Sequence, residues 1–301
     1  MQLHGWIIYN GSLPGKKFLD FAEWIQRAAI RKGGTATIYK NSELLSYLNT
    51  ENLSLLKDER VPLPNYVLFA DKDVYLARQL ELLGLRVFNR AEAIAVSDDK
   101  IATYQQLAIK KLPIPRTIIA PKTFFSEEPT ESVMQTAVDT FGFPMIVKEA
   151  FGSFGQQVYL IETKEQLLHR LQQIDGKPYM FQEFISTSYG KDLRLHVVGN
   201  HVVTAMRRQA VNDFRANVSA GGSMEAYKPS EYETKIAVAA TKAIGADFAG
   251  VDLLFGPDQS PIICEINSNA HIRNIYDCTN INVADYIIDY IYKSCGDNGG
   301  K

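Results

Sequence analysis

Short apolar runs alternate with amphipathic stretches from residue 1 to about residue 95. Each apolar run has the length of a strand, and each amphipathic stretch has the 3.6-residue period of a helix. Asn10-Gly11 and Gly33-Gly34 mark turns between them. This alternation predicts a parallel sheet covered by helices. Strands are expected at 6–9, 36–39, 66–69 and 86–88, and helices at 16–31 and 73–83.

After residue 97 the chain becomes rich in strand patterns. A helix is expected to begin after an N-cap at Ser97 or Asp98 and to end before Pro113. Gly199-Asn200 lies between two alternating runs, which is a strong hairpin signal. Helices are expected at 101–111, 231–244 and 283–292, and strands at 145–149, 158–161, 193–198, 201–206, 249–255 and 261–266.

Length, charge and cysteine usage narrow the class of protein. With 301 residues, of which 46% are hydrophobic, the chain is long enough for two or three packed domains. A net charge of −2 gives no general basic field, which excludes nucleic acid and membranes as expected partners. Three cysteines without CxxC spacing indicate neither zinc nor a disulfide framework. Without a basic leader or an apolar run of about 20 residues, the sequence predicts a cytoplasmic protein.

Three oxygen-bearing side chains fall on two neighbouring predicted strands near the C-terminus. Asp252 lies in one strand, while Glu265 and Asn267 lie in the next and share a face because they are two residues apart. Such a set suits magnesium, which takes carboxylate and phosphate oxygens. The alternative is a pair of solvated strand faces. Both acids are flanked by apolar runs, however, and buried acids are rarely unpaired, so the pattern favours a metal site.

A glycine-containing loop follows the apolar strand that ends near Lys148. Glycines in Gly152-Ser153-Phe154-Gly155 allow backbone N–H groups to approach phosphate oxygens, and the lysine adds a point charge. Lys100 is a second candidate for a phosphate contact. The alternatives are an ordinary hairpin turn and a surface lysine beside two aspartates.

Two further groups of residues have the chemistry of nucleotide and anion binding. The strand end Gln182-Glu183-Phe184-Ile185 could read adenine through its backbone, and Asp192 follows at a distance suited to ribose hydroxyls. Arginines suit bidentate binding of carboxylates and phosphates, with a solvated basic face as the alternative. The candidates are Arg194, Arg207, Arg208 and Arg215, together with Asn217.

Taken in order, these segments resemble the ATP-grasp superfamily, and specifically its RimK-like glutamate ligases. The resemblance covers about Ser97 to Ala284 and is specific because nine segments occur in family order. The part before residue 96 resembles a pre-ATP-grasp domain only in its alternating pattern. The matching segments are 97–100, 146–148, 152–155, 182–185, 192–194, 213–217, 221–222, 250–252 and 264–267.

The resemblance implies an ATP-grasp fold of α/β and α+β domains, with ATP held between two antiparallel sheets. It divides the chain into a pre-ATP-grasp domain (1–96), a central subdomain (97–185), a C-terminal subdomain (186–296) and a disordered tail (297–301). The resemblance further assigns Lys100, Lys148 and the 152–155 loop to the phosphates, residues 182–185 to adenine and Asp192 to ribose. It assigns Asp252, Glu265 and Asn267 to two magnesium ions, with manganese as an alternative. Arg215 and Asn217 would contact the transferring phosphoryl group.

The implied reaction joins a carboxylate to an amine through an acyl-phosphate at the expense of ATP. The expected partners are a small-molecule, peptide or protein carboxylate and an amino acid, expected to be glutamate, which Arg194, Arg207, Arg208 and Arg273 would recognise. A homo-oligomer is one option for the assembly. Two alternatives stay open, a graspetide-type ligase that closes peptide macrocycles and a catalytically silent ATP-binding scaffold.

The sequence departs from the family pattern directly after the proposed metal ligands. Ser268-Asn269-Ala270-His271 stands where glutamate ligases commonly have a Ser-Pro-Gly-like turn. This segment is expected to border the acceptor pocket, with Ser268 and Asn269 as candidate substrate contacts. The departure bears on which substrates are used rather than on the ligase chemistry.

Overall fold

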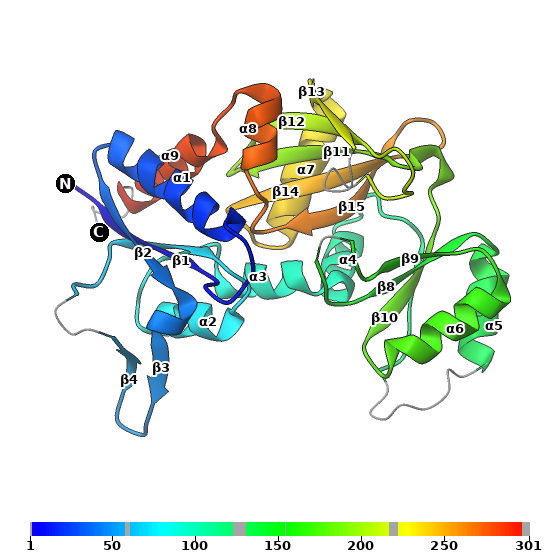
Figure 1. The fold of residues 1–301 in the computed structure, drawn as a ribbon, viewed down its shortest axis with the longest axis horizontal. Coiled ribbons are helices and arrows are strands. Elements are labelled where there is room, and N and C mark those ends of the chain that lie inside the picture. The colour runs from blue at the N-terminus through cyan, green and yellow to red at the C-terminus, as the bar shows by residue number, and fades with distance from the viewer. Residues whose placement is uncertain (1, 58–60, 123–130, 154, 217–221, 297–301) are drawn as a thin grey trace.

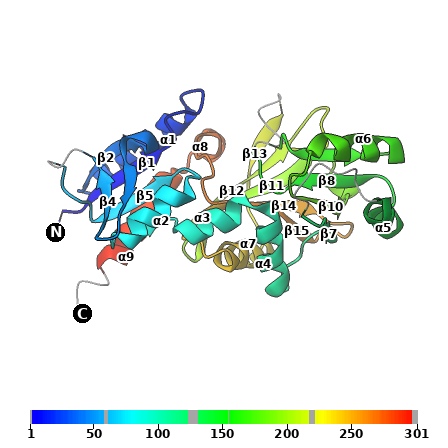
Figure 2. The same ribbon diagram turned by 90° about the horizontal axis from the view of Figure 1, so that it is seen from below.

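Three sheets with their helices follow one another along the molecule. The computed structural model describes all residues except 1, 58–60, 123–130, 154, 217–221 and 297–301. A parallel sheet lies at one end, a small antiparallel sheet at the other, and a five-stranded antiparallel sheet between them (Figures 1 and 2). The tail expected to be disordered lies outside the described residues.

The N-terminal sheet is parallel, as the alternating pattern predicts. Its strand order is β2-β1-β5-β6, so the carboxyl ends of the strands share one edge. Helix α1 buries Phe21, Ile25 and Ala28, which recur at helical spacing, against one face of the sheet. The strands are β1 (His4–Tyr9), β2 (Thr35–Lys40), β5 (Tyr66–Ala70) and β6 (Val87–Phe88), and the helices are α1 (Lys17–Arg31), α2 (Val74–Leu82) and α3 (Ala91–Asp98).

The last helix of the chain returns to this first sheet. Helix α9 (Val283–Gly296) lies against α1, and its Ile287 and Ile291 join the same buried cluster as Phe21 (Figure 1). Two ion pairs at the rim also join the helices, Arg31 to Asp285 at 2.6 Å and Lys32 to Asp289 at 2.7 Å. These pairs are partly exposed and contribute little, so apolar burial carries the contact.

The four-stranded antiparallel sheet has the order β7-β10-β8-β9 and contains the predicted hairpin of β8 and β9. Met145 and Val147 face helices α5 and α6, whereas Ile146 and Lys148 face the other way, because side chains alternate along a strand. The elements are α4 (Lys100–Ile109), β7 (Thr117–Ile119), α5 (Glu131–Phe141), β8 (Met145–Glu149), β9 (Val158–Ile161), α6 (Lys164–Ile174), β10 (Tyr179–Glu183) and the 3-10 helix η2 (Ser186–Ser188).

The five-stranded sheet has the order β13-β12-β11-β14-β15. Helix α7 covers the face that carries Leu193 and Leu195, so Asp192 and Arg194 point to the opposite face. Gly199 turns the β11–β12 hairpin with φ of 58°, where a side chain would be strained. The elements are β11 (Lys191–Val198), β12 (His201–Gln209), β13 (Ser223–Tyr227), α7 (Glu231–Ala243), β14 (Phe248–Phe255), β15 (Pro261–Asn267) and α8 (Arg273–Thr279).

Some elements differ from the sequence expectation. Helix α3 was not predicted, because apolar residues at 91 and 93–96 lie all round the helix and leave no alternation of apolar and polar faces. This helix takes up Ser97 and Asp98. The N-cap of α4 is therefore Asp99, whose carboxylate accepts hydrogen bonds from the N–H groups of Ile101 and Ala102. Also absent from the expectation were the hairpin of β3 (Leu45–Leu48) and β4 (Leu53–Leu56) and the 3-10 helix η1 (Asn41–Glu43).

The described part of the chain has no helix that combines the length and apolarity needed to cross a bilayer.

One buried side chain joins the first sheet to the five-stranded sheet. Asn89, directly after β6, is fully buried. Its Nδ2 donates to the carbonyls of Phe248 and Ser268, each at 2.9 Å, and its Oδ1 accepts from the N–H groups of Asp247 and Phe248 at 2.7 and 3.2 Å. Asn89 thereby fixes both the start of β14 and the segment after β15.

We expect Asn89→Ala to lower the free energy of unfolding by at least about 2 kcal/mol, because it leaves buried backbone donors and acceptors unpaired. Asn274→Ala, at an exposed site on α8, is the matched control and should change stability by less than about 0.5 kcal/mol. Urea unfolding followed by circular dichroism measures both. Equal midpoints for the two variants would show that the Asn89 hydrogen bonds are not needed for stability.

Candidate active site

A cavity of about 600 Å³ lies where the three sheets meet, a volume within the usual range for small-molecule sites. Residues from the N-terminal parallel sheet, the four-stranded antiparallel sheet and the five-stranded sheet all line it. Seven lysines and arginines and five aspartates and glutamates are among these residues. Although the whole chain carries a net charge of −2, the cavity has a local basic excess that suits an anionic ligand.

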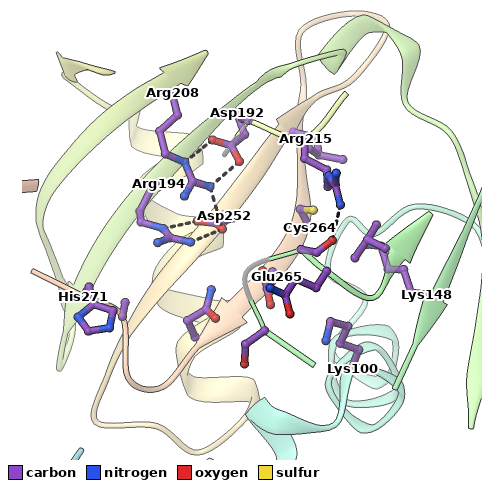
Figure 3. Close-up of a pocket in the computed structure, with 18 of the residues that line it drawn as sticks. Lys100, Lys148, Asp192, Arg194, Arg208, Arg215, Asp252, Cys264, Glu265 and His271 are labelled. Atoms are coloured by element: carbon purple, nitrogen blue, oxygen red, sulfur yellow. Dashed lines mark hydrogen bonds and ion pairs between the residues drawn. The ribbon is translucent and has the colours of Figure 1, made fainter. Parts of the chain in front are cut away.

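Three buried charged side chains and the partly buried Arg194 form a network on the cavity face of β11, β12 and β14 (Figure 3). Asp192 is the cross-strand partner of Arg208, and Arg194 is the partner of Asp252. Arg208 binds both oxygens of Asp192, with Nε to Oδ1 at 2.7 Å and Nη2 to Oδ2 at 2.5 Å. Arg194 binds Asp252 in the same bidentate way, at 2.7 and 2.5 Å, and Arg208 Nη2 also reaches Asp252 Oδ2 at 3.0 Å.

The network explains why acidic groups are tolerated inside the sheet. Burial by itself would raise the pKa of Asp252, but two guanidinium groups hold this pKa below its usual value. Burial raises the pKa of Asp192, which has one arginine partner and lies beside the Asp252 charge. Burial also lowers the pKa of neighbouring His196 to about 3, so this histidine is neutral and adds no charge.

The two candidate phosphate lysines face the cavity from different elements. Lys148 on β8 is buried, and its Nζ donates to the Tyr104 hydroxyl at 3.2 Å. Lys100 begins α4, and its Nζ donates to the Gly152 carbonyl at 3.1 Å. Burial lowers the pKa of Lys100, and the carboxylate of Glu265 partly offsets this change. The structure thus brings both lysines to the cavity, as expected.

Cationic side chains hold the loop between β8 and β9 in place. Arg215 Nη1 donates to the Gly155 carbonyl at 2.6 Å, and Lys72 Nζ donates to Ser153 Oγ at 3.1 Å. Gly152 has φ of 143°, and a Cβ there would clash with the Gln157 side chain. The first glycine is therefore required by the loop geometry. Phe154 lies outside the described residues.

The predicted adenine-binding strand end lines the cavity, but two of its side chains have structural partners. Gln182 Nε2 donates to Thr117 Oγ1 at 2.9 Å. Glu183 accepts from Arg116 Nε at 2.7 Å, and its N–H donates to the Arg116 carbonyl at 3.0 Å. Phe184 and Ile185 also border the cavity.

The candidate metal ligands lie on neighbouring strands. Asp252 pairs with Glu265 in register, and Asn267 lies opposite Gly250. Asn267 Nδ2 is buried without a hydrogen-bond partner in the described part of the chain. No group of three His, Cys, Asp or Glu side chains among the described residues is placed to hold a metal. Two carboxylates and an amide nevertheless fit a magnesium ion whose remaining ligands come from phosphate and water.

Arginines, rather than the metal expected from the sequence, supply the positive charge beside buried Asp252 in the structure. Arg194 and Arg208 both contact its carboxylate.

Three arginines expected to recognise a free dicarboxylate are engaged elsewhere or already paired. Arg194 and Arg208 line the cavity but bind aspartates. Arg207 lies on the opposite face of β12, near Glu225 at 3.6 Å and over the Phe255 ring, and does not line the cavity. Its position follows from strand alternation, since only one of two consecutive arginines can face the cavity.

Two more candidates differ from the expectation. Arg273 pairs with Asp20 outside the cavity. Ser268 is buried rather than cavity-lining, because its N–H donates to Ser97 Oγ at 3.0 Å and its carbonyl accepts from Asn89. Asn269 does border the cavity. Asn217 lies outside the described residues.

The first domain also contributes to the cavity, which was not expected from the sequence. Asn10, Asp71 and Lys72 line the cavity, together with Phe18 and Phe21 of α1. A usable signal was present, because Asn10 and Asp71 directly follow buried strands of a predicted parallel sheet, and ligands bind at that edge.

Comparisons with known proteins agree with this site. A family model described as RimK-like ATP-grasp domain matches residues 97–291. The chain is 37% identical to the uncharacterized MG012 homolog of Mycoplasma pneumoniae, over 72% of this chain and 77% of that protein. It is 36% identical to a probable alpha-L-glutamate ligase of Legionella pneumophila, over 72% of this chain and 70% of the relative.

A solved structure supports the fold independently. The ATP-grasp ligase PsnB, complexed with minimal precursor, Mg and ADP, matches with a TM-score of 0.70 at 17% identity, over 97% of this chain and 98% of that chain. At this identity the likeness concerns the fold, and it confirms the expected ATP-grasp architecture. From the matched family and its named relatives, the chain belongs to the RimK-like ATP-grasp family and is an ATP-dependent carboxylate–amine ligase.

Proposed function

We propose that this ligase adds glutamate to a carboxylate of a protein, peptide or small molecule through an acyl-phosphate. The name of the Legionella pneumophila relative, a probable alpha-L-glutamate ligase, supports glutamate as the amine substrate. The observation that carries the reaction type is the placement of Glu265 and Asn267 in a cavity that Lys100 and Lys148 also line. Basic groups beside oxygen ligands suit a nucleotide bound with its metal.

Each set of residues has a part in binding ATP under this proposal. Lys100 and Lys148 bind the phosphates, and the 152–155 loop covers them. Residues 182–185 border adenine, through the backbone rather than through the engaged Gln182 and Glu183 side chains. Asp192 meets the ribose through lone pairs that its Arg208 hydrogen bonds leave available.

Asp252, Glu265 and Asn267 would hold two magnesium ions, or manganese in their place. When bound, these ions neutralise charge on the β- and γ-phosphates. Glu265 is suited to this part because its carboxylate has no hydrogen bond or ion pair to another described residue. Arg194 and Arg208 keep Asp252 ionised and fixed in direction.

The reaction then follows from positioning and charge. The substrate carboxylate attacks the γ-phosphorus, and ADP leaves. The amine, which has lost one proton to solvent, attacks the carbonyl carbon of the acyl-phosphate. The C–O bond to phosphate breaks, the second amine proton leaves with hydrogen phosphate, and an amide forms. Arg215 and Asn217 would contact the transferring phosphoryl group, since guanidinium stabilises charge on its oxygens. Arg215 now donates to the Gly155 carbonyl, so binding of nucleotide exchanges this partner for a phosphate oxygen.

We expect Glu265→Gln to lower kcat/KM by at least about 100-fold, or about 2.7 kcal/mol, because one negative charge is lost next to the cation. Nucleotide affinity should fall in magnesium and stay unchanged in EDTA. Glu225→Gln, at an exposed site beside Arg207, is the matched control. Rates of ADP release and calorimetric titrations measure these effects. Wild-type activity of Glu265→Gln at low magnesium would remove Glu265 from the metal site.

We expect glutamate to be incorporated at least about tenfold faster than glutamine, a difference of about 1.4 kcal/mol. The assay incubates the enzyme with Mg-ATP, a dialysed cell extract and each of twenty labelled amino acids, and mass spectrometry identifies the product. Glu265→Gln serves as the inactive control. Preference for a neutral or basic amino acid would overturn the glutamate assignment and leave the ligase mechanism in place.

A further inference from the structure

Two polar residues lie at the carboxyl edge of the N-terminal parallel sheet, in the wall of the cavity. Asn10 follows β1 and Asp71 follows β5, and these strands are paired so that Tyr9 lies beside Ala70. Ligands of parallel sheets bind at this edge. The reaction proposed above uses neither residue.

The Asp71 side chain is held in one orientation. Its Oδ1 accepts hydrogen bonds from the Lys72 N–H at 2.7 Å and from Asn10 Nδ2 at 3.1 Å. Its backbone carbonyl accepts from Asn269 Nδ2 at 2.8 Å. The residue is only 6% exposed, so these contacts fix the position of Oδ2 as well.

Two hydrogen-bond acceptors at this place have no donor. Asp71 Oδ2 and Asn269 Oδ1 are both shielded from solvent, and neither has a partner among the residues that the structure describes. Buried acceptors without donors destabilise a protein, so we expect a bound ligand to supply the donors here. Asn269 lies two residues beyond Asn267, a proposed metal ligand, which places the pair beside the reaction centre.

Among the described residues, the Asp71 carboxylate has no cationic side chain as an ion-pair partner. Lys72 is adjacent in sequence, but its Nζ binds Asp98 at 2.5 Å and Ser153 Oγ at 3.1 Å. Burial raises the pKa of Asp71, and the hydrogen bonds from Lys72 and Asn10 only partly oppose this effect. A cation that contacts Oδ2 would remove the cost of burying the carboxylate.

The side chains of α1 and His271 in this part of the cavity wall form an aromatic cluster, although Lys17 and Arg194 act on His271 as positive charges. His271 packs against Phe18 and Phe21, with ring centroids 5.4 and 6.3 Å apart. Burial lowers the pKa of His271 to about 4, so the imidazole is neutral near pH 7 and does not repel positive charge. Aromatic rings attract ammonium groups rather than carboxylates.

We propose that Asp71 and Asn269 bind the primary ammonium group of the amino-acid substrate. Asp71 Oδ2 and Asn269 Oδ1 accept two of its three N–H donors, and the carboxylate supplies the matching charge. The inference rests on the proposed ligase function and adds the site that recognises the amine. It assigns the N-terminal domain a direct part in substrate selection.

The test compares amino acids with analogues that lack the α-ammonium group. The probes are L-glutamate with glutarate, L-alanine with propionate, and L-lysine with 6-aminohexanoate, titrated calorimetrically into the full chain with magnesium and a non-hydrolysable ATP analogue. In at least one pair the wild-type protein should bind the amino acid tenfold or more tightly than its analogue. In Asp71→Asn, the affinities for the amino acid and its analogue should differ by no more than about twofold, because the new Nδ2 is a donor that faces the ammonium donors.

Two further variants control the comparison. Asp20→Asn removes a negative charge near His271 from a residue that does not line the cavity, and should preserve the ratio. Asn269→Ala removes the second acceptor while keeping the Asp71 carboxylate, and should lower the ratio about fivefold. Nucleotide affinity should be unchanged in Asp71→Asn, which shows that the variant is folded.

The outcomes separate this inference from the glutamate proposal. The Asp71–Asn269 site is overturned if the wild-type protein binds no amino acid more tightly than its analogue without the ammonium group. It is also overturned if Asp71→Asn keeps the wild-type affinity ratio. If alanine or lysine binds more tightly than its analogue in an Asp71-dependent way, and glutamate does not, the site is supported and glutamate is overturned as the substrate.

Discussion

The ion-pair network of Asp192, Arg194, Arg208 and Asp252 is the constraint on which the active site depends. Two carboxylates and two guanidinium groups share a buried sheet face, and removing one partner would leave an uncompensated buried charge, which costs about 3–5 kcal/mol. The network exists because register pairs the residues across β11, β12 and β14. The hydrogen bonds of the network fix the orientation of each charged group in this wall of the cavity. A charged substrate therefore binds to groups that are already oriented.

Much of the fold could be predicted from the sequence because periodicity reports burial on one face. Helix α1 was predicted to within one residue, since an apolar stripe marks it locally. The turn of the β11–β12 hairpin was predicted from Gly-Asn, but the two strands extend two and three residues beyond the expected outer ends. Helix α3 could not be found in this way, because its apolar residues surround the helix and no polar face marks its period. The contact of α9 with α1 is set by residues far apart in the chain, which a local pattern cannot report.

The candidate site was predictable in its residue types and less so in their partners. Lys148 and Glu265 line the cavity as expected, and each is visible in the sequence because it interrupts an apolar run. Lys100 also lines the cavity, but it follows two aspartates, and the family resemblance rather than a local pattern indicates its role. That Asp252 pairs with two arginines depends on register and on side-chain direction, which single-strand patterns leave open. Asp71 was missed because its importance comes from Asn269, which lies 198 residues further along the chain.

The return of α9 to the first sheet also has a consequence during synthesis on the ribosome. Strand β6 ends at Phe88, whereas α9 begins at Val283, so the first sheet is made long before one of the helices that bury it. At about 5–20 residues per second, the delay is roughly 10–40 s. During this interval Phe21 and Ile25 on α1 lack the Ile287 and Ile291 side chains with which they form one cluster. The nascent N-terminal segment thus presents apolar surface of the kind that chaperones bind, until the last helix of the chain covers it.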